Sequence, residues 1–403
     1  MKSFISKFIC ALLLISASTS VQAEAKANAK PSYTITPNTS PIDKSMKKYS
    51  TYNHYTKHYY VLRSYLEKLE KTGGGTLTLK AGTYTISNTV YIPSHVKIIL
   101  DGATIKKGVK TGTSRFPASK SIFQLIAPSK AAKHGVYGKY DGEKNIAILG
   151  KHKASIDLGY ADTTFAIIAG HNQNVTIENI TFRNMHSGHF IEMDATKGAL
   201  IKGNRFLNSV ASVDKNKEAI NLDTPDRSTK GWSQEWSKFD CTANKDITIE
   251  NNQFYNLDRS IGTHKYSGGS YHDHIVVKHN DIEKMREDAI RVMNWSHAEI
   301  SDNTIHNVAG GESGKRGILA SGAMDPTFKN NRFQQVGRPI QFMVWKNSGP
   351  GSQYEETGND LSSANKKALK TNVVKQPTEN FIRINKYWNQ FEHPEKIYVH
   401  VTH

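Results

Sequence analysis

Residues 277–305 read VKHNDIEKMREDAIRVMNWSHAEISDNTI, and this stretch decides the fold. Its first aliphatic residue, Val277, is followed three positions later by Asn280 and then by a large apolar residue. After a turn comes a second apolar segment around Ile290, and the pattern starts again at Ile300. One repeat is therefore about two dozen residues long, with period-two alternation inside each segment, which is typical of short β-strands.

The same pattern occurs six times between Val175 and Met343. The first segments carry the anchor pairs Ile177/Phe182, Ile201/Phe206, Ile249/Phe254, Val277/Ile282, Ile300/Ile305 and Phe328/Phe333. The second segments are centred on Ile191, Ile220, Ile261, Ile290, Ile318 and Ile340. Such a regular repeat indicates a solenoid, in which each repeat packs on its neighbours.

The length of the repeat favours a parallel β-helix. A helical repeat needs a longer unit with a 3.6-residue stripe, and a leucine-rich repeat needs leucine at several fixed positions. In a parallel β-helix the coils stack roughly 4.8 Å apart and enclose one continuous core. We therefore predict an all-β protein built on a parallel β-helix solenoid.

Asparagine recurs at the bend of five repeats. These residues are Asn204, Asn252, Asn280, Asn303 and Asn331. Asparagine tolerates left-handed backbone geometry, and its amide can bond the equivalent amides in neighbouring coils. The sequence therefore predicts a column of stacked asparagines.

The N-terminus has the pattern of a secretory signal. Lys2 and Lys7 precede an apolar stretch, residues 8–15, and the segment ends in Val21-Gln22-Ala23. We interpret residues 1–23 as a signal peptide and expect a secreted, extracellular protein. No later segment is apolar enough to span a membrane.

Cysteine usage and charge narrow the class of partner. Cys10 lies in the signal, which leaves Cys241 alone in the mature chain, so no disulfide holds the fold together. The net charge is +17, or +15 without Lys2 and Lys7 (17 − 2). We expect an anionic polysaccharide partner, with no nucleic acid and no membrane, and a monomeric protein.

The two ends of the chain are predicted to be caps. Residues 24–56 are polar and are expected to form an extended or mobile leader. A single β-helix domain then covers 57–403, with an N-terminal capping helix at about 57–75, coils at about 76–345 and a C-terminal cap or tail at about 346–403. One face of the capping helix carries Leu62, Tyr65, Leu66 and Leu69, and the aromatic residues of the tail are Phe381, Tyr387, Trp388, Phe391 and Tyr398. Lys366 to Lys370 indicates a short helix.

Residues 73–105 read GGGTLTLKAGTYTISNTVYIPSHVKIILDGATI. This segment resembles the N-terminal coils of the pectin lyase-like superfamily, which includes polygalacturonases, pectate lyases and other polysaccharide-cleaving right-handed β-helices. The resemblance extends through the repeats and implies a right-handed parallel β-helix. Because one such scaffold hosts hydrolases, lyases, esterases, epimerases and adhesins, the function must be argued from a site.

Polar residues flank the inward isoleucines of the second segments, and neighbouring coils should place them in columns. One column reads Glu192, Asn221, Gly262, Arg291, Leu319 and Gln341, and another reads Asp194, Asp223, His264, Met293 and Ser321. Just before the strands lie His189, Glu218, Arg259, Asp288, Arg316 and Arg338. The charges change from acidic to basic along the axis, which predicts a functional groove.

A long insertion lies beside this groove. Residues 224–245, TPDRSTKGWSQEWSKFDCTANK, place Trp232 and Trp236 next to the acidic coils, and Trp295 follows two coils later. Aromatic rings beside polar groups suit the C–H faces of sugars. We expect one of the two loop tryptophans to bind substrate and the other to pack, with Lys265, Trp295, Glu192, Glu218 and Asn221 also contacting the substrate.

A glycoside hydrolase is the first functional hypothesis. Such an enzyme uses one carboxylic acid to protonate the glycosidic oxygen and a second carboxylate to activate water or attack the sugar. The proposed catalytic residues are Asp194, Asp223, His264 and Arg291, whose order resembles that of the polygalacturonase motifs. INLD, GTHK and RVM stand where that family has NTD, GHG and RIK, and no cofactor is needed.

Two alternatives remain open. A polysaccharide lyase would hold calcium on oxygen donors such as Glu192, Asp194, Glu218, Asn221 and Asp223, with Lys265 as the better base than Arg259 or Arg291. A non-catalytic polysaccharide-binding or adhesive β-helix would need only the aromatic residues. His272 and His274 also form a candidate metal pair, for which the sequence offers no third ligand.

Overall fold

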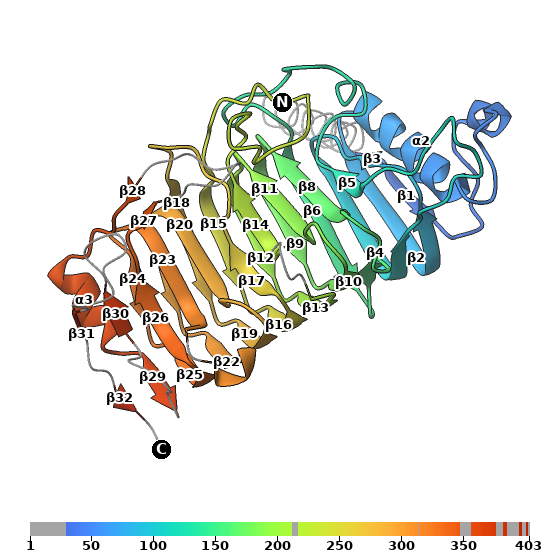
Figure 1. The fold of residues 1–403 in the computed structure, drawn as a ribbon. Helices are drawn as coiled ribbons and strands as arrows, with labels where there is room; N and C mark the ends of the chain where they lie inside the picture. Colours follow the sequence, from blue (N-terminus) through green and yellow to red (C-terminus); the bar gives the residue numbers. More distant parts are fainter. Residues whose placement is uncertain are drawn as a thin grey trace, which may run out of the picture.

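The protein is a parallel β-helix whose coils stack along one axis (Figure 1). The computed structural model describes residues 30–211, 217–312, 314–346, 356–375, 382–384, 395–396 and 400–401. The predicted signal peptide, 1–23, lies outside these residues. Nearly all strand pairings are parallel and join one coil to the next, so the predicted fold class is confirmed.

The strands form three columns along the axis. The first column contains β1 (Ser32–Ile35), β2 (Gly75–Ile86), β4 (Val96–Lys107), β6 (Lys144–Lys151), β9 (Gln173–Glu178), β12 (Lys197–Lys202), β15 (Lys245–Glu250), β18 (His272–Lys278), β21 (Glu299–Ser301) and β24 (Thr327–Lys329). The second contains β7 (Ser155–Asp157), β10 (Thr181–Met185), β13 (Arg205–Ser209), β16 (Gln253–Leu257), β19 (Asp281–Met285), β22 (Thr304–Val308), β25 (Arg332–Val336), β29 (Val373–Lys375) and β32 (His400–Val401).

The third column carries the predicted groove. It contains β3 (Val90–Tyr91), β5 (Ser121–Gln124), β8 (Phe165–Gly170), β11 (Ile191–Asp194), β14 (Glu218–Asp223), β17 (Arg259–Gly262), β20 (Ile290–Ser296), β23 (Arg316–Met324), β26 (Arg338–Phe342) and β30 (Ile382–Ile384). Two antiparallel pairs lie near the C-terminal end: β30 with β31 (Glu395–Lys396), and β27 (Trp345–Lys346) with β28 (Glu356–Thr357).

Each regular coil has three strands, whereas the repeat pattern predicted two. The first apolar segment bends at its asparagine, so that Ile177 lies in β9 and Phe182 in β10. The residue in the left-handed region is the one before each stacked asparagine, such as Gly203 at φ 65° or Asn251 at φ 55°. The stacked asparagines themselves are therefore not the left-handed residues, and that part of the prediction is wrong.

The stacked asparagines form a continuous ladder, and their predicted amide bonding is confirmed. Nδ2 of Asn204 donates to Oδ1 of Asn252 at 3.1 Å, and the same oxygen accepts the main-chain N–H of Asn204 at 2.9 Å. This arrangement repeats from coil to coil. The asparagine ladder consists of Asn204, Asn252, Asn280, Asn303, Asn331 and Asn372. It satisfies polar groups that would otherwise be buried without partners at every bend.

The interior is filled by stacked apolar side chains, as the repeat predicted. The inward isoleucines pair directly between coils and are fully buried; they are Ile191, Ile220, Ile261, Ile290, Ile318 and Ile340. At the second column, the ring of Phe206 stacks on Phe182 at 4.9 Å and on Phe254 at 4.8 Å between centroids. This regular core fixes the register of the third column, and therefore the position of the groove residues.

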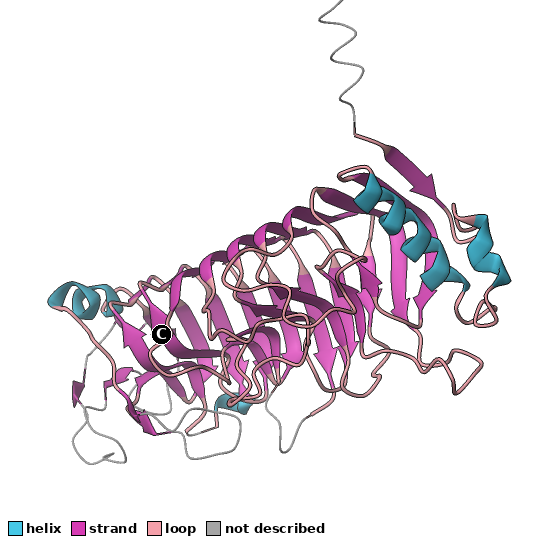
Figure 2. Cartoon of the chain, turned by 90° about the horizontal axis from the view of Figure 1, so that it is seen from above, coloured by secondary structure: helices cyan, strands magenta, loops and turns pink. Residues whose placement is uncertain are grey.

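The N-terminal end is closed by helix α2 (Lys57–Lys71), which lies across the first coils (Figure 2). Leu62, Leu66 and Leu69 are fully buried, which confirms the predicted capping helix. Of the extended or mobile leader expected at residues 24–56, the mobile alternative is wrong for residues 30–56. Strand β1 pairs with β2, and η1 (Lys44–Lys48) buries Met46, because apolar residues in this polar segment reach the core.

The C-terminal coils continue beyond the predicted limit near residue 345. Ile382 pairs with Ile340 and Val374 with Phe333, so β30 and β29 add to the stack. The predicted short helix is present as α3 (Ser363–Leu369), and a further 3-10 turn is η2 (Ala309–Gly311). The aromatic residues predicted to cover this end lie outside the described residues. Among the described residues, no helix is long and apolar enough to cross a membrane.

Candidate functional site

The predicted columns of polar side chains are present on the third strand column. Glu192 pairs with Asn221, Asn221 with Gly262, and Gly262 with Arg291. Asp194 pairs with Asp223 in the same register. The acidic end of the groove is therefore formed by β11 and β14.

The insertion after β14, residues 224–244, is here called the tryptophan loop. It folds back over β8 and packs against the loop after β5, and both loops lie above β8 and β11 in Figure 1. The main-chain N–H of Val136 donates to the carbonyl of Trp236 at 2.7 Å, and the Trp236 indole donates to Gln124 Oε1 at 3.1 Å. These contacts hold the loop over the preceding coils.

Gly170, at the end of β8, makes this close packing possible. A Cβ at this position would lie 2.6 Å from the Trp232 ring and 2.9 Å from the Trp236 ring. No real side chain fits such distances. Gly170 therefore allows both indoles to lie directly on the coil.

A pocket of about 180 Å³ opens between the tryptophan loop and the strands β11 and β14. One wall is aromatic and contains Phe165 and Trp232. The buried polar groups of the lining are His189, Glu192 and Asp223, and His264 lies beside them. The lining also contains three lysines that are more exposed than these buried groups: Lys217, Lys230 and Lys265.

The structure brings some of the predicted site residues into this pocket and leaves others outside it. Those that line it are Glu192, Asp223, Trp232, His264 and Lys265. Those that do not are Asp194, Glu218, Asn221, Trp236, Arg291 and Trp295. Glu218 and Asn221 still contact His264, and Asp194 accepts the main-chain N–H of Asp223.

Trp295 is not a substrate-binding residue, contrary to the prediction. Asn294, at φ 54°, turns the chain at the end of β20, so the next side chain points into the core. Trp295 is fully buried there and its indole donates to Thr263 Oγ1 at 2.8 Å. Trp236 is likewise buried, so Trp232 is the loop tryptophan that reaches the pocket.

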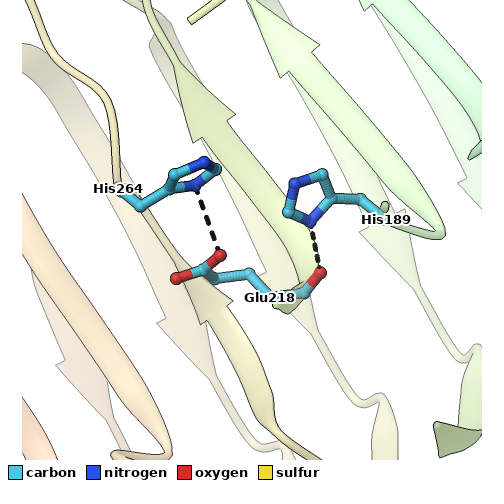
Figure 3. Close-up of side chains that lie close together, drawn as sticks. All are labelled: His189, Glu218 and His264. Carbon is cyan, nitrogen blue, oxygen red and sulfur yellow. Dashed lines mark hydrogen bonds and ion pairs between the residues drawn. The ribbon is translucent and has the colours of Figure 1, made fainter. Parts of the chain in front are cut away.

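Two histidines and a glutamate meet at the base of the pocket (Figure 3). Nδ1 of His189 donates to the main-chain carbonyl of Glu218 at 2.6 Å. His264 Nδ1 lies 3.4 Å from Glu218 Oε2 and 3.6 Å from Asp223 Oδ2. Asn221 completes the group by accepting from His264 Nδ1 at 3.0 Å and donating to Glu192.

Asp194 and Asp223 each hold the main chain of the next coil. Asp194 Oδ1 accepts the N–H of Asp223 at 3.2 Å. Asp223 Oδ1 accepts the N–H groups of His264 and Lys265, both at 3.0 Å. Asp194 is completely buried, so its role in the structure is to position the chain that carries the pocket residues.

Burial changes the ionisation of the acidic groups. It raises the pKa of Glu192 well above its usual value, and the nearby Asp223 adds to this effect. The pKa of Asp194 is also raised, by burial first and then by Glu192 and Asp223. Burial lowers the pKa of His189 to about 3, which leaves a neutral imidazole at pH 7.

Glu218 behaves in the opposite way. Burial alone would raise the pKa of its carboxyl, but His264 and Arg259 hold it well below its usual value. Arg259 Nε lies 3.9 Å from Glu218 Oε1, and its NH1 donates to Asp288 at 3.2 Å. Arg316 shares the same Asp288, so the basic half of the groove is a chain of ion pairs.

The oxygen donors do not fit the calcium cage that a lyase would need. Calcium prefers six to eight oxygen ligands around one point. Here the Asn221 amide is shared between His264 and Glu192, while the Glu218 oxygens face His264 and Arg259. Imidazole and guanidinium groups thus occupy the positions where further oxygen donors would be required.

The candidate metal pair His272 and His274 is separated in the structure. His272 is fully buried, and its Nδ1 accepts the main-chain N–H of Asn244 at 3.0 Å. His274 is exposed and lies with Asp273 and His297 on the surface. The surface cluster therefore takes His297 from the next coil in place of His272.

Several pocket residues are not among those that the sequence predicts. His189 belongs to one of the predicted columns but not to the predicted site, and Phe165, Lys217 and Lys230 belong to neither. Their pattern gave no signal, because Phe165 belongs to an earlier coil that only the folded loop brings close. The one available clue to His189 was its place two residues before an inward isoleucine.

Known proteins share this architecture. A family model described as "Right handed beta helix region" matches residues 104–333 and 239–372. Plasmin and fibronectin-binding protein A of Streptococcus pneumoniae (strain ATCC BAA-255 / R6) is 25% identical over 263 residues, which cover 60% of this chain and 36% of that protein. The chain thus spans little more than a third of the length of this relative.

A solved structure agrees in fold. The crystal structure of PfbA, a surface adhesin of Streptococcus pneumoniae, has a TM-score of 0.60 and 16% sequence identity, and the match covers 90% of this chain and 80% of that one. At this identity the likeness shows the fold alone. Together with the family match, it confirms the fold that the resemblance to the pectin lyase-like superfamily implied, and the chain belongs to the right-handed β-helix family.

Proposed function

We propose that this protein is a non-enzymatic, carbohydrate-binding β-helix that holds an acidic sugar residue in the pocket beneath the tryptophan loop. The observation that carries the proposal is the combination of an aromatic wall, Phe165 and Trp232, with three lysines around one small cavity. Pockets for drug-sized ligands have roughly 300 to 1,000 Å³. A cavity of about 180 Å³ suits a single sugar ring of a longer chain.

The lysines give the pocket its preference for negative charge. Lys265 Nζ donates to the carbonyl of Lys230 at 2.8 Å, which fixes its ammonium group at the pocket. Lys217 and Lys230 are nearby and partly or fully exposed. With a net charge of +17, the whole chain also attracts anionic polymers at long range.

Binding without cleavage is favoured by the use that the structure makes of its acids. Of the two aspartates expected to act as a catalytic pair, Asp194 is buried, does not line the pocket and bonds the main chain of the next coil. A catalytic acid or base must reach the substrate within hydrogen-bonding distance or through one water. The pair Asp194 and Asp223 therefore lacks one accessible member.

The relatives support an extracellular adhesive role. Plasmin and fibronectin-binding protein A is named for its ligands, and PfbA is described as a surface adhesin. The signal-like pattern of residues 1–23 is consistent with export. We propose that this chain also acts outside the cell, with a polysaccharide as its ligand.

A glycoside hydrolase remains the second candidate, with Glu192 and Asp223 as its catalytic acids in place of Asp194 and Asp223. Glu192 and Asp223 both line the pocket, come from neighbouring coils and lie diagonally across the register. A diagonal pair is farther apart than directly opposed residues, and inverting hydrolases need roughly 6.5 to 9.5 Å between their carboxyl groups. This geometry is the specific observation in favour of catalysis.

One experiment separates the two candidates. The purified protein is screened against acidic and neutral polysaccharides, and bound ligands are then incubated with it and analysed for products. Saturable binding of acidic chains with unchanged ligand is the expected result. New reducing ends would favour the hydrolase, and ultraviolet absorbance of an unsaturated uronate would favour a lyase.

The matched variants test the pocket itself. Lys230→Glu reverses an exposed charge at the pocket and should weaken binding at least about tenfold. Lys151→Glu makes the same change at the exposed last residue of β6, outside the pocket lining. Equal loss in both variants would mean that only overall charge matters. Binding of plasmin or fibronectin in place of any glycan would contradict the choice of ligand.

A further inference from the structure

The base of the pocket holds donor atoms that suit a transition metal better than calcium. One donor atom from each of His189, Glu218 and His264 lies within 4.8 Å of the other two. Imidazole nitrogen and carboxylate oxygen are the usual protein ligands of zinc, at about 2.0 to 2.2 Å from the metal. The three residues come from consecutive coils, so the β-helix itself sets their spacing.

The hydrogen bond of His189 favours metal binding. Nδ1 of His264 is the ring nitrogen that faces Glu218 and Asp223, and Nδ1 of His189 donates to a main-chain carbonyl. A metal-binding histidine almost always uses its second ring nitrogen in this way, because the bond fixes the tautomer and leaves the other nitrogen with its lone pair. The rings face each other above Glu218, with centroids 5.5 Å apart (Figure 3).

The carboxylates supply a second, independent observation. Both carboxylate oxygens of Glu218 are buried and lack a hydrogen-bond partner among the described residues, and so does Asp223 Oδ2. Glu218 is completely buried and Asp223 almost so. Buried acceptors without donors are rare in folded proteins and call for an explanation such as a bound ion.

We propose that His189, Glu218 and His264 form a binding site for a divalent transition-metal ion of the zinc class, with Asp223 as a fourth donor. The ion would take the place of a proton on His264 Nδ1, which lies 3.4 Å from Glu218 Oε2 and 3.6 Å from Asp223 Oδ2. Three of these four residues also line the sugar pocket. The metal site is independent of the proposed ligand, since its donors bind the ion whether or not a sugar is present.

The nearest competing explanation is an ion pair without metal. A protonated His264 between Glu218 and Asp223 would also account for the distances. A second cluster, Asp273, His274 and His297, offers similar donors on the surface, and it would give adventitious zinc binding. The experiment must therefore separate the pocket from both.

The test titrates zinc chloride alone into full-length protein that has been treated with chelator and dialysed. Isothermal titration calorimetry gives the stoichiometry, and the absorption spectrum of the cobalt-substituted protein reports tetrahedral nitrogen and oxygen ligands. We expect one ion bound at the pocket. His264→Gln should weaken this binding at least about 100-fold, since even changes in groups behind metal ligands cost 10- to 100-fold.

The control variant removes the surface cluster. His274→Gln with His297→Gln should keep the pocket ion with unchanged affinity and cobalt spectrum. Thermal unfolding verifies that His264→Gln folds, and Asp223→Asn serves as a second pocket variant. The proposal is overturned by three results: no zinc bound by the wild type, unchanged affinity in both pocket variants, or loss of all binding in the surface variant.

Discussion

The asparagine ladder and the pocket lie on the same coils but treat buried polar atoms differently. Along the ladder from Asn252 to Asn372, each Oδ1 accepts two N–H groups from the preceding coil. At and beside the pocket, Asp194 Oδ2, Asp223 Oδ2 and both carboxylate oxygens of Glu218 have no hydrogen-bond donor among the described residues, although Glu218 forms ion pairs with His264 and Arg259. Each such atom costs about 1 to 3 kcal/mol. The ladder thus stabilises the solenoid, whereas the carboxylate oxygens without donors reduce its stability.

The largest expected effect is on the core that supports both regions. Ile261→Asp places a charge among fully buried isoleucines, and it should prevent folding, because an uncompensated buried charge costs more than the whole fold can supply. The measurement is the yield and circular dichroism of secreted protein. Ile261→Val, expected to cost about 1 kcal/mol, is the control. A folded Ile261→Asp variant would refute the assigned register.

The ladder should be the next most sensitive. Asn280→Ala removes its bonds to Ile249 and Asn303 and leaves the N–H groups of Asn252 without their acceptor. We expect a loss of about 2 to 4 kcal/mol, measured as a lower urea midpoint. Sugar binding by the remaining folded protein should not change. An unchanged midpoint would mean that the ladder adds little to stability.

The packing of the tryptophan loop should have an intermediate effect. Gly170→Ala places a methyl group 2.6 Å from the Trp232 ring, so the loop must move outward, at a cost of about 1 to 3 kcal/mol. We expect a changed tryptophan fluorescence and weaker sugar binding. Gly358→Ala is the matched control, because no atom lies within 4 Å of the new methyl group. Identical behaviour of the two variants would show that the loop does not shape the pocket.

The smallest effect on stability is expected at the pocket itself. Asp223→Asn keeps an Oδ1 that accepts from His264 and Lys265, so the free energy of unfolding should change by less than about 1 kcal/mol. Ligand binding should fall at least about tenfold, because Asp223 lines the pocket and its carboxylate is replaced by an amide. A large loss of stability with intact binding would contradict this difference, because Asp223 would then stabilise the fold, as the ladder residues do, and would not serve binding.

The repeat pattern was sufficient to predict the solenoid, the inward isoleucines and the stacked asparagines, because each follows from a periodicity of two within a fixed repeat. It also brought Glu192, Asp223 and His264 to one face. The prediction that Trp295 contacts the substrate was wrong. Asn294 has a left-handed backbone, which reverses the inward and outward alternation of side chains at the end of the strand. The role of Asp194 depends on the main chain of the next coil, which no spacing within one repeat reveals.

The most direct test of the account is a titration of acidic oligosaccharides into the purified protein, followed by product analysis of the same samples. We expect saturable binding that is at least about tenfold weaker in Lys230→Glu, retained in Lys151→Glu and weakened by salt, with the oligosaccharide recovered intact. Cleaved products that disappear in Asp223→Asn would contradict it and establish an enzyme. Absence of binding to any acidic oligosaccharide would contradict the proposed function of the pocket.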